Sequence, residues 1–327
     1  MTPRCCMSLV GLSMLGVLGC FQDAGAQQPF PSRAITIVVP LPPGGTSDII
    51  ARSIGQKVGE YTGQSVLIEN VSGAGTAIGA QRVAQARPDG YTLLVATTTT
   101  ISSNPHLYRK LSYSMSQFEP ITLLTQHDLA VHISPKLPVS TLQELIAYAA
   151  RTPGGISYST TGRGSLSEVL GEMMKAAFKV EMRDIPYRGA APALVDVMRG
   201  EIDMHFDGIT STVPFLRAGK AKVIATTGVE RAAVSPNIPT LVELGYKDLV
   251  MGNIYALLAP KGTPRPIVDT LNSLVRRALE DPVLRERLTS QGAPPKPTTP
   301  EGLAEVMARD SATFEKTVRE LKIRTVD

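Results

Sequence analysis

The chain has 327 residues, and 43% of them are hydrophobic, which is enough to fill the cores of two domains of ordinary size. Its 33 lysines and arginines only slightly exceed its 29 aspartates and glutamates, so the net charge is +4 at pH 7. There is no basic block and no basic patch with interleaved aromatic residues. We therefore expect no nucleic-acid partner.

Residues 1–26 have the features of a secretory signal. Arg4 precedes an apolar stretch at 7–18 that is too short to span a membrane, and Ala24-Gly25-Ala26 offers a cleavage site of small residues. We therefore predict a signal peptide over 1–26 and export to the periplasm. In the alternative interpretation, Val17-Leu18-Gly19-Cys20 is a lipoprotein box and Cys20 carries a lipid anchor. All three cysteines lie in this segment, so the mature chain is expected to form no disulfide.

The clearest local pattern begins with the β-branched run Ile37-Val38-Val39, which predicts a buried strand. Prolines and glycines at 40–45 then interrupt regular structure. Thr46, Ser47 and Asp48 are typical N-cap residues, and apolar residues recur behind them at helical spacing. The unpaired N–H groups at the start of this helix favour an anion site built from backbone. The alternative is an ordinary turn between a strand and a helix that binds nothing.

Strands and helices alternate through the rest of the chain. Strands at 66–69 and 91–96 flank a short helix at 77–86, and this order predicts a parallel sheet covered on both faces. Two further strands are expected at 121–124 and 129–133. The pattern then restarts and predicts a second parallel sheet.

We therefore predict an α/β fold with two lobes, a ligand cleft between them and two crossing segments. Lobe 1 comprises 27–125 and 250–327, and lobe 2 comprises 126–249. The helical end, whose last helix is expected at 300–321, should pack on lobe 1. Two such lobes can open and close around a small ligand by hinge motion.

Three loops follow predicted strands and are rich in Gly, Ser and Thr, at 41–47, 97–103 and 160–165. Their N–H and hydroxyl donors suit a carboxylate. Arg163 and Arg188 are candidate cations, with solvated loop arginines as the alternative. Asp207 ends a predicted strand, and there it either faces the cleft, to receive a ligand amine or order water, or is a plain strand-end carboxylate.

Catalytic motifs are absent from the sequence. It contains no Gly-x-Ser-x-Gly, no Gly-Lys-Ser/Thr phosphate loop and no His-Glu-x-x-His, and its four histidines lack metal spacing. The glycine-rich segment 73–79 differs from a dinucleotide fingerprint because its third glycine comes one place late. We expect no cofactor, no bound metal and no enzymatic activity. The alternative is a hydrolase in which Ser165 acts with Glu168.

Several short motifs occur in a characteristic order, including Pro88-Asp89-Gly90-Tyr91, Gly162-Arg163-Gly164-Ser165, Pro186-Tyr187-Arg188-Gly189 and Ala259-Pro260-Lys261-Gly262-Thr263-Pro264. With them, the mature chain resembles the periplasmic substrate-binding proteins of tripartite tricarboxylate transporters, also called the Bug family. The resemblance implies a type II periplasmic binding protein that closes on a small carboxylate and serves a membrane transporter. A sensor that presents its ligand to a signalling receptor is the alternative, and we expect a monomer. Three departures from the family concern the ligand. Glu168 stands where the family usually has a histidine, the chain has no tryptophan, and Pro42-Pro43 makes the first loop stiffer than is usual in the family.

The resemblance also implies a set of ligand-binding residues in the loops of both lobes, with Gly44, Gly45, Thr46 and Ser165 as donors from opposite sides. The whole set is Leu41, Pro43, Gly44, Gly45, Thr46, Ser47, Thr97, Thr98, Thr99, Thr161, Gly162, Ser165, Tyr187, Gly189, Ala190 and Asp207.

Overall fold

The structure is a computed structural model that describes residues 2, 30–162, 165–209, 213–321, 323 and 325. Apart from residue 2, the predicted signal segment with its lipoprotein alternative at Cys20 lies outside the described residues, and so does the candidate cation Arg163. Within the described part of the chain, no helix is both long and apolar enough to cross a membrane.

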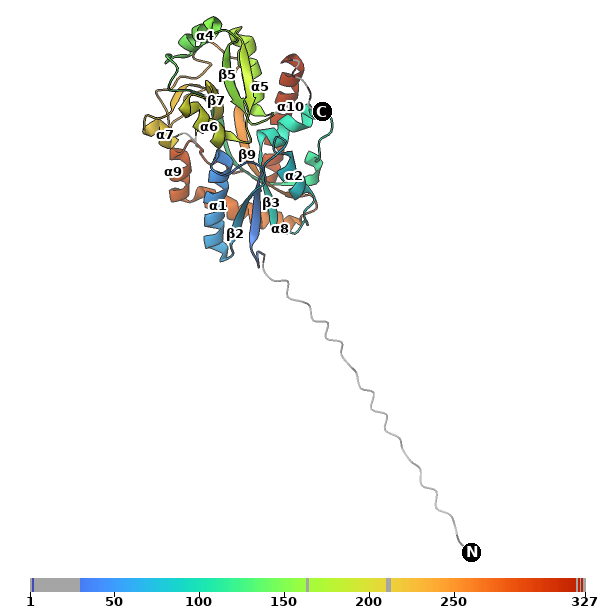
Figure 1. Cartoon of the computed structure of the whole chain (residues 1–327). Coiled ribbons are helices and arrows are strands. Elements are labelled where there is room, and N and C mark those ends of the chain that lie inside the picture. The colour runs from blue at the N-terminus through green and yellow to red at the C-terminus, as the bar shows by residue number, and fades with distance from the viewer. Residues whose placement is uncertain are drawn as a thin grey trace.

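The structure has two α/β lobes, as predicted (Figure 1). The names lobe 1 and lobe 2 follow the predicted ranges. The strands and helices of lobe 1 are β1 (Ile35–Val39), α1 (Thr46–Thr62), β2 (Val66–Asn70), α2 (Ala77–Ala84), β3 (Thr92–Thr97), the π-helical turn η1 (Thr99–Ser103), α3 (Asn104–Leu107), η2 (Met115–Gln117), β9 (Gly252–Pro260), α8 (Arg265–Glu280), α9 (Pro282–Ser290) and α10 (Pro300–Leu321). Those of lobe 2 are α4 (Leu142–Arg151), β5 (Ile156–Thr160), α5 (Leu166–Phe178), β6 (Met182–Pro186), α6 (Ala190–Arg199), β7 (Met204–Gly208), α7 (Val213–Arg217) and β8 (Lys222–Thr226).

A single long strand, β4 (Phe118–Ile133), runs through both lobes. The sheet order is β2-β1-β3-β9-β4-β7-β5-β6, and β8 pairs with β4 beside this path. The prediction of two separate strands here was wrong, because β9 pairs with the first part of β4 while β7 and β8 pair with its last part. These pairings are antiparallel, so the predicted parallel sheets are parallel only within β2-β1-β3 and within β7-β5-β6. β4 and β9 together form the crossing between the lobes.

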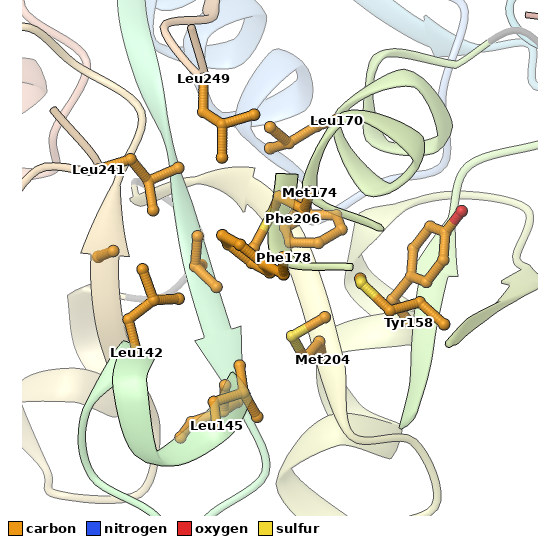
Figure 2. Close-up of a cluster of buried hydrophobic side chains, with 14 of the residues drawn as sticks. Leu142, Leu145, Tyr158, Leu170, Met174, Phe178, Met204, Phe206, Leu241 and Leu249 are labelled. Atoms are coloured by element: carbon orange, nitrogen blue, oxygen red, sulfur yellow. The ribbon is translucent and has the colours of Figure 1, made fainter. Parts of the chain in front are cut away.

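Each lobe has its own hydrophobic core. In lobe 2, α5 and α4 cover the strands through a cluster that includes Leu145, Leu170, Met174 and Phe206, as Figure 2 shows. In lobe 1, α1 and α8 cover one face of the sheet, and α2 and the start of α10 cover the other.

Helix α10 departs from the expectation that it packs on lobe 1 alone. Leu303, in its first turns, belongs to a lobe 1 core cluster, whereas Phe314 is buried in the lobe 2 cluster and Val318 packs against it. The apolar residues in the two halves of α10 therefore pack against different lobes. The last helix therefore spans the junction of the lobes.

Candidate functional site

A buried carboxylate holds the loop between β1 and α1 in place. Asp48 accepts hydrogen bonds from the Gly44 N–H (3.0 Å) and from Arg52 Nε (3.0 Å). Asn70 Nδ2 donates to the same carboxylate at 3.1 Å and to the Leu41 carbonyl at 2.9 Å. Burial acts to raise the pKa of Asp48, but the hydrogen bonds from Arg52, Gly44 and Asn70 outweigh it and lower the pKa. The charged carboxylate thus fixes a loop that lacks regular structure.

The predicted donors of this loop fall into two groups. The Gly44 N–H, which we expected to face a ligand, donates to Asp48 in this structure. Thr46 and Ser47, in contrast, are only 2% and 1% exposed. The Ser47 hydroxyl has no hydrogen-bond partner among the described residues, whereas the Thr46 side chain interacts with the Tyr255 hydroxyl. A buried hydroxyl without a partner costs free energy, so the Ser47 hydroxyl in the first turn of α1 is the best ligand donor of the loop. Of the other predicted residues here, Pro43 is exposed and Gly45 is buried.

The three threonines after β3 are buried, and each has a structural contact. The hydroxyl of Thr98 accepts a hydrogen bond from the Ile254 N–H at 2.8 Å, which ties the loop to β9. The Thr97 hydroxyl lies 3.4 Å from the hydroxyl of another threonine of the same loop. Thr99 Oγ1 accepts a hydrogen bond from the Leu166 N–H at 3.4 Å. Since Leu166 begins α5, this last contact joins lobe 1 to lobe 2.

In lobe 2, the loop after β5 is organised as a helix cap. Ser165 Oγ accepts a hydrogen bond from the Glu168 N–H at 3.2 Å at the start of α5. The Thr161 N–H donates to Ser167 Oγ at 3.1 Å. The hydrolase alternative paired Ser165 with Glu168, but the contact between them here runs through the Glu168 backbone. This arrangement is that of an N-cap, and it does not activate a nucleophile.

The β1–α1 loop is covered by the start of α6 in lobe 2. A Cβ placed on Gly189 would lie 2.5 Å from Pro42 Cδ, so these two residues already touch. A Cβ placed on Gly44 would lie 3.7 Å from the Cβ of Ala191, next to the predicted site residue Ala190. Together with the contact of Thr99 to α5, this makes the structure a closed arrangement of the lobes.

An inter-lobe cavity with a volume of ≈ 540 Å³ remains beside these contacts. We call it the outer cavity. Lobe 1 contributes Leu41 and the glycine-rich segment 73–75, and lobe 2 contributes Thr161, Gly162 and Tyr187. Among its described lining residues, Arg188 carries the only full charge. The Tyr187 hydroxyl donates to Asp196 at 2.8 Å, and burial together with that carboxylate raises the pKa of Tyr187 to about 12.

Asp207 lies where the crossing strands meet lobe 2. It is buried at the end of β7, close to the ring of Tyr255 on β9. Burial raises the pKa of Tyr255 well above its usual range, and the Asp207 carboxylate raises it further. The Tyr255 hydroxyl accepts a hydrogen bond from Asn253 Nδ2 at 3.0 Å. The Asp207 carboxylate is thus held among the crossing strands.

Sequence reasoning missed three residues that shape this cleft. Asn70 positions the β1–α1 loop, Tyr255 lies near enough to Asp207 for the carboxylate to raise its pKa, and Tyr108 lines the outer cavity. Asn70 is a polar residue at the carboxyl end of a strand, which is a usable signal. Tyr255 is an aromatic residue in an apolar segment, where a core position is the simpler interpretation, and no pattern around Tyr108 indicates a site.

The chain is similar to known proteins over most of its length. Residues 50–323 match the model of the tripartite tricarboxylate transporter family receptor, TctC. The chain is 30% identical to protein BugT of Bordetella pertussis over 94% of this chain and 97% of that protein. It is 36% identical to MatC of Rhodopseudomonas palustris, solved with bound malate, over 88% of this chain and all of that one, with a TM-score of 0.84. It is 30% identical to another R. palustris protein, solved with adipate, over 91% of this chain and all of that one, with a TM-score of 0.88.

These matches confirm the resemblance read from the motifs and the fold class that it implied. The family model covers most of the chain, and the solved structures share its two-lobed architecture. The chain belongs to the TctC (Bug) family of periplasmic solute-binding proteins, the receptors of tripartite tricarboxylate transporters.

Proposed function

We propose that the chain captures a small organic carboxylate between its lobes and delivers it to a membrane transporter. The observation that carries the proposal is the buried hydroxyl of Ser47, which has no partner among the described residues and lies in the first turn of a 17-residue helix. The partial positive charge of a helix N-terminus favours an anion there. The solved relatives that hold malate and adipate support the choice of a carboxylate.

The second lobe supplies the opposite side of the site. Ser165 is the N-cap of α5, so a second helix N-terminus lies on that side of the closed lobes. Arg188 carries a full positive charge on the rim of the outer cavity. A ligand with one carboxylate at α1 and a second acidic group towards the outer cavity would use donors of both lobes. This favours a dicarboxylate over a monocarboxylate.

A binding screen tests the ligand class. Purified protein is titrated by calorimetry with malate, adipate, acetate and the diamide of adipic acid. We expect a dicarboxylate to bind with 1:1 stoichiometry and the diamide not to bind. At a hundred times its Kd, the bound acid should raise the free energy of unfolding by about 2.7 kcal/mol. If none of the acids binds or shifts the thermal transition, the carboxylate proposal is wrong.

Ser47→Ala tests the site within the cleft. Removal of a buried hydroxyl that has no partner should leave the stability of the free protein unchanged or slightly raised. The same change should weaken the binding of the acid found in the screen about tenfold, since a hydrogen bond to a charged group contributes about 1.5–3 kcal/mol. Ser116→Ala, on the exposed turn η2, is the matched control. Equal affinities of Ser47→Ala and the parent protein would place the ligand elsewhere.

Delivery to a transporter is tested in the cell. A strain that lacks the gene should lose uptake of the radiolabelled acid and regain it with the parent gene, but not with a Ser47→Ala gene at low acid concentration. If uptake is unchanged and only the transcriptional response to the acid disappears, the protein acts as a sensor instead.

A further inference from the structure

A second inter-lobe cavity, which we call the hinge cavity, lies where β4 crosses between the lobes. Its volume is ≈ 500 Å³, and it shares no lining residue with the outer cavity. Lobe 2 contributes Asp128, Thr226 and the segment 229–234, and lobe 1 contributes Thr289 and Lys296 with their neighbours. A cavity of this size accommodates a small metabolite, since ligand sites measure about 300–1,000 Å³.

Two buried side chains that border the hinge cavity have unused hydrogen-bonding groups. His127 is 8% exposed, and neither nitrogen of its ring has a partner. Its ring stacks on Tyr255 with 5.2 Å between centroids, so its position is fixed. Thr226 is 2% exposed, and its hydroxyl has no partner either. Because burial keeps the imidazole neutral, it offers one donor and one acceptor, and Thr226 adds a hydroxyl.

The cavity also carries charges of both signs. Among the described residues, no salt-bridge partner within 4 Å is found for the Asp128 and Glu230 carboxylates or for the Lys296 ammonium. Both lie close enough for Lys296 to act on the pKa of Asp128, which burial raises. Arg231, a second cation of the lining, is already paired with Glu243 at 2.9 Å. An occupant with an ammonium near Asp128 and a carboxylate near Lys296 would match both charges.

We propose that the hinge cavity is a second ligand site, for a small zwitterion of the amino-acid class. Its ammonium faces Asp128, its carboxylate faces Lys296, and its polar side chain reaches His127 and Thr226. The cavity is lined from both lobes, so its shape depends on how far the lobes are closed. Occupancy of the hinge cavity is therefore coupled to closure of the main cleft, and by reciprocity each ligand alters the affinity for the other.

The test follows the ring of His127 directly. Protein labelled with ¹⁵N in its histidines is titrated with L-serine, L-glutamine and L-arginine, and with acetate and ethylamine as probes that carry one charge each. The His127 resonances are assigned with a His127→Gln variant. We expect at least one of the amino acids to shift the His127 signals saturably, and acetate and ethylamine to leave them in place.

Charge variants then assign the site. Lys296→Met and Asp128→Asn should each weaken the binding of the amino acid at least tenfold. Lys261→Met and Asp269→Asn, which remove exposed charges of lobe 1 that are paired with Glu119 and Arg265, should have no effect. Ser47→Ala should also leave this binding intact, which separates the hinge cavity from the main cleft.

Four outcomes would overturn the proposal. The first is that no amino acid shifts the His127 signals at 100 mM or below, in which case the cavity holds water only. The second is that acetate shifts the signals as strongly as the amino acids do. The third is that Lys296→Met binds as well as the parent protein, and the fourth is that Ser47→Ala abolishes the shift. None of these results bears on the binding of malate or adipate. The proposed function is tested separately, by the binding screen with the carboxylates.

Discussion

Single residues set the geometry of the cleft, and Asp48 is the clearest example. Its carboxylate accepts from a backbone N–H, an amide and a guanidinium, and these donors come from the β1–α1 loop, the end of β2 and the second turn of α1. An aspartate in the first turn of a helix interacts favourably with the helix dipole. In the structure it also connects the loop to the neighbouring strand. The prolines and glycines of this loop allow its shape, but the buried carboxylate selects it.

Asp48→Ala should therefore reduce both stability and binding. The variant leaves the donors of Gly44 and Asn70 without an acceptor, and we expect a loss of about 1–3 kcal/mol in the free energy of unfolding. Ligand affinity should fall as well, since the loop loses its fixed shape. Asp269→Ala, which breaks the exposed pair with Arg265 on α8, is the control and should cost about 0–1 kcal/mol. Urea denaturation and calorimetry measure the two effects, and similar losses in both variants would contradict this account of Asp48.

At the scale of elements, the two lobes meet through the β1–α1 loop and the start of α6. Gly189 has an extended backbone, with φ 161°, which any residue can adopt. A glycine is needed there because Pro42 of the other lobe occupies the space that a Cβ would fill. The contact exists only while the lobes are closed.

Gly189→Ala should hold the lobes apart without destabilising either of them. A Cβ only 2.5 Å from Pro42 Cδ and 2.7 Å from Pro42 Cγ forbids the closed contact. We expect the affinity for the acid found in the screen to fall at least tenfold, while the thermal transition of the free protein changes little. The double variant Pro42→Ala/Gly189→Ala should recover most of the affinity, because the atoms that clash are gone. A double variant as weak as Gly189→Ala would show that the loss has another cause.

The elements themselves were largely predictable from the sequence, whereas their pairing was not. The run Ile37-Val38-Val39 and the polar residues Thr46, Ser47 and Asp48 identify β1 and α1 because both signals are local. The N-cap itself is Gly45, however, and the three polar residues form the first turn of α1. The direction in which β4 and β9 pair, in contrast, depends on residues that are far apart in the sequence. An apolar segment reads the same whether its partner is parallel or antiparallel, so the sequence did not distinguish two strands from the single strand that joins the lobes.

The candidate site, too, was predictable only where it depends on local sequence signals. Residues of the Gly-, Ser- and Thr-rich loops do come together from both lobes, as Pro42 with Gly189 and Thr99 with Leu166 show. Which donors stay available was not predictable, because it depends on partners distant in the sequence. Thr98 illustrates this, since its hydroxyl accepts from Ile254 on β9, 156 residues further along the chain.

Helix α10 acts at the scale of the whole molecule, because its two halves pack on different lobes. Phe314 is 5% exposed in the lobe 2 core, so Phe314→Ala should lower the free energy of unfolding by about 3–5 kcal/mol. Val283→Ala, at a position of α9 that is 72% exposed, should change it by less than about 0.5 kcal/mol. Urea denaturation measures both. A loss for Phe314→Ala as small as that of the control would mean that the end of α10 is not part of the fold's core.

The stability of the whole molecule should also depend on pH, because three buried histidines stay neutral. Burial lowers the pKa of His127 and of His132 to about 4, and it lowers the pKa of His205 well below its usual value. In the unfolded chain a histidine titrates at about 6.5, so between these pH values the unfolded state binds more protons than the folded state. The stability that the neutral rings contribute is therefore complete above pH 6.5 and is lost as the pH falls towards 4.

Each such histidine should reduce the free energy of unfolding by about 1.4 kcal/mol per pH unit in this window. Asp48, whose pKa is lowered, titrates below the window, whereas Asp128 and Asp310, whose pKa values burial raises, act in the opposite direction to the histidines. Urea denaturation at pH 7.5, 6.5, 5.5 and 5.0 measures how the free energy of unfolding depends on pH. The variant His127→Gln should reduce this dependence by the contribution of one histidine. Equal stability at pH 7.5 and pH 5.0 would mean that water or a bound partner already lets these rings take up protons in the folded state.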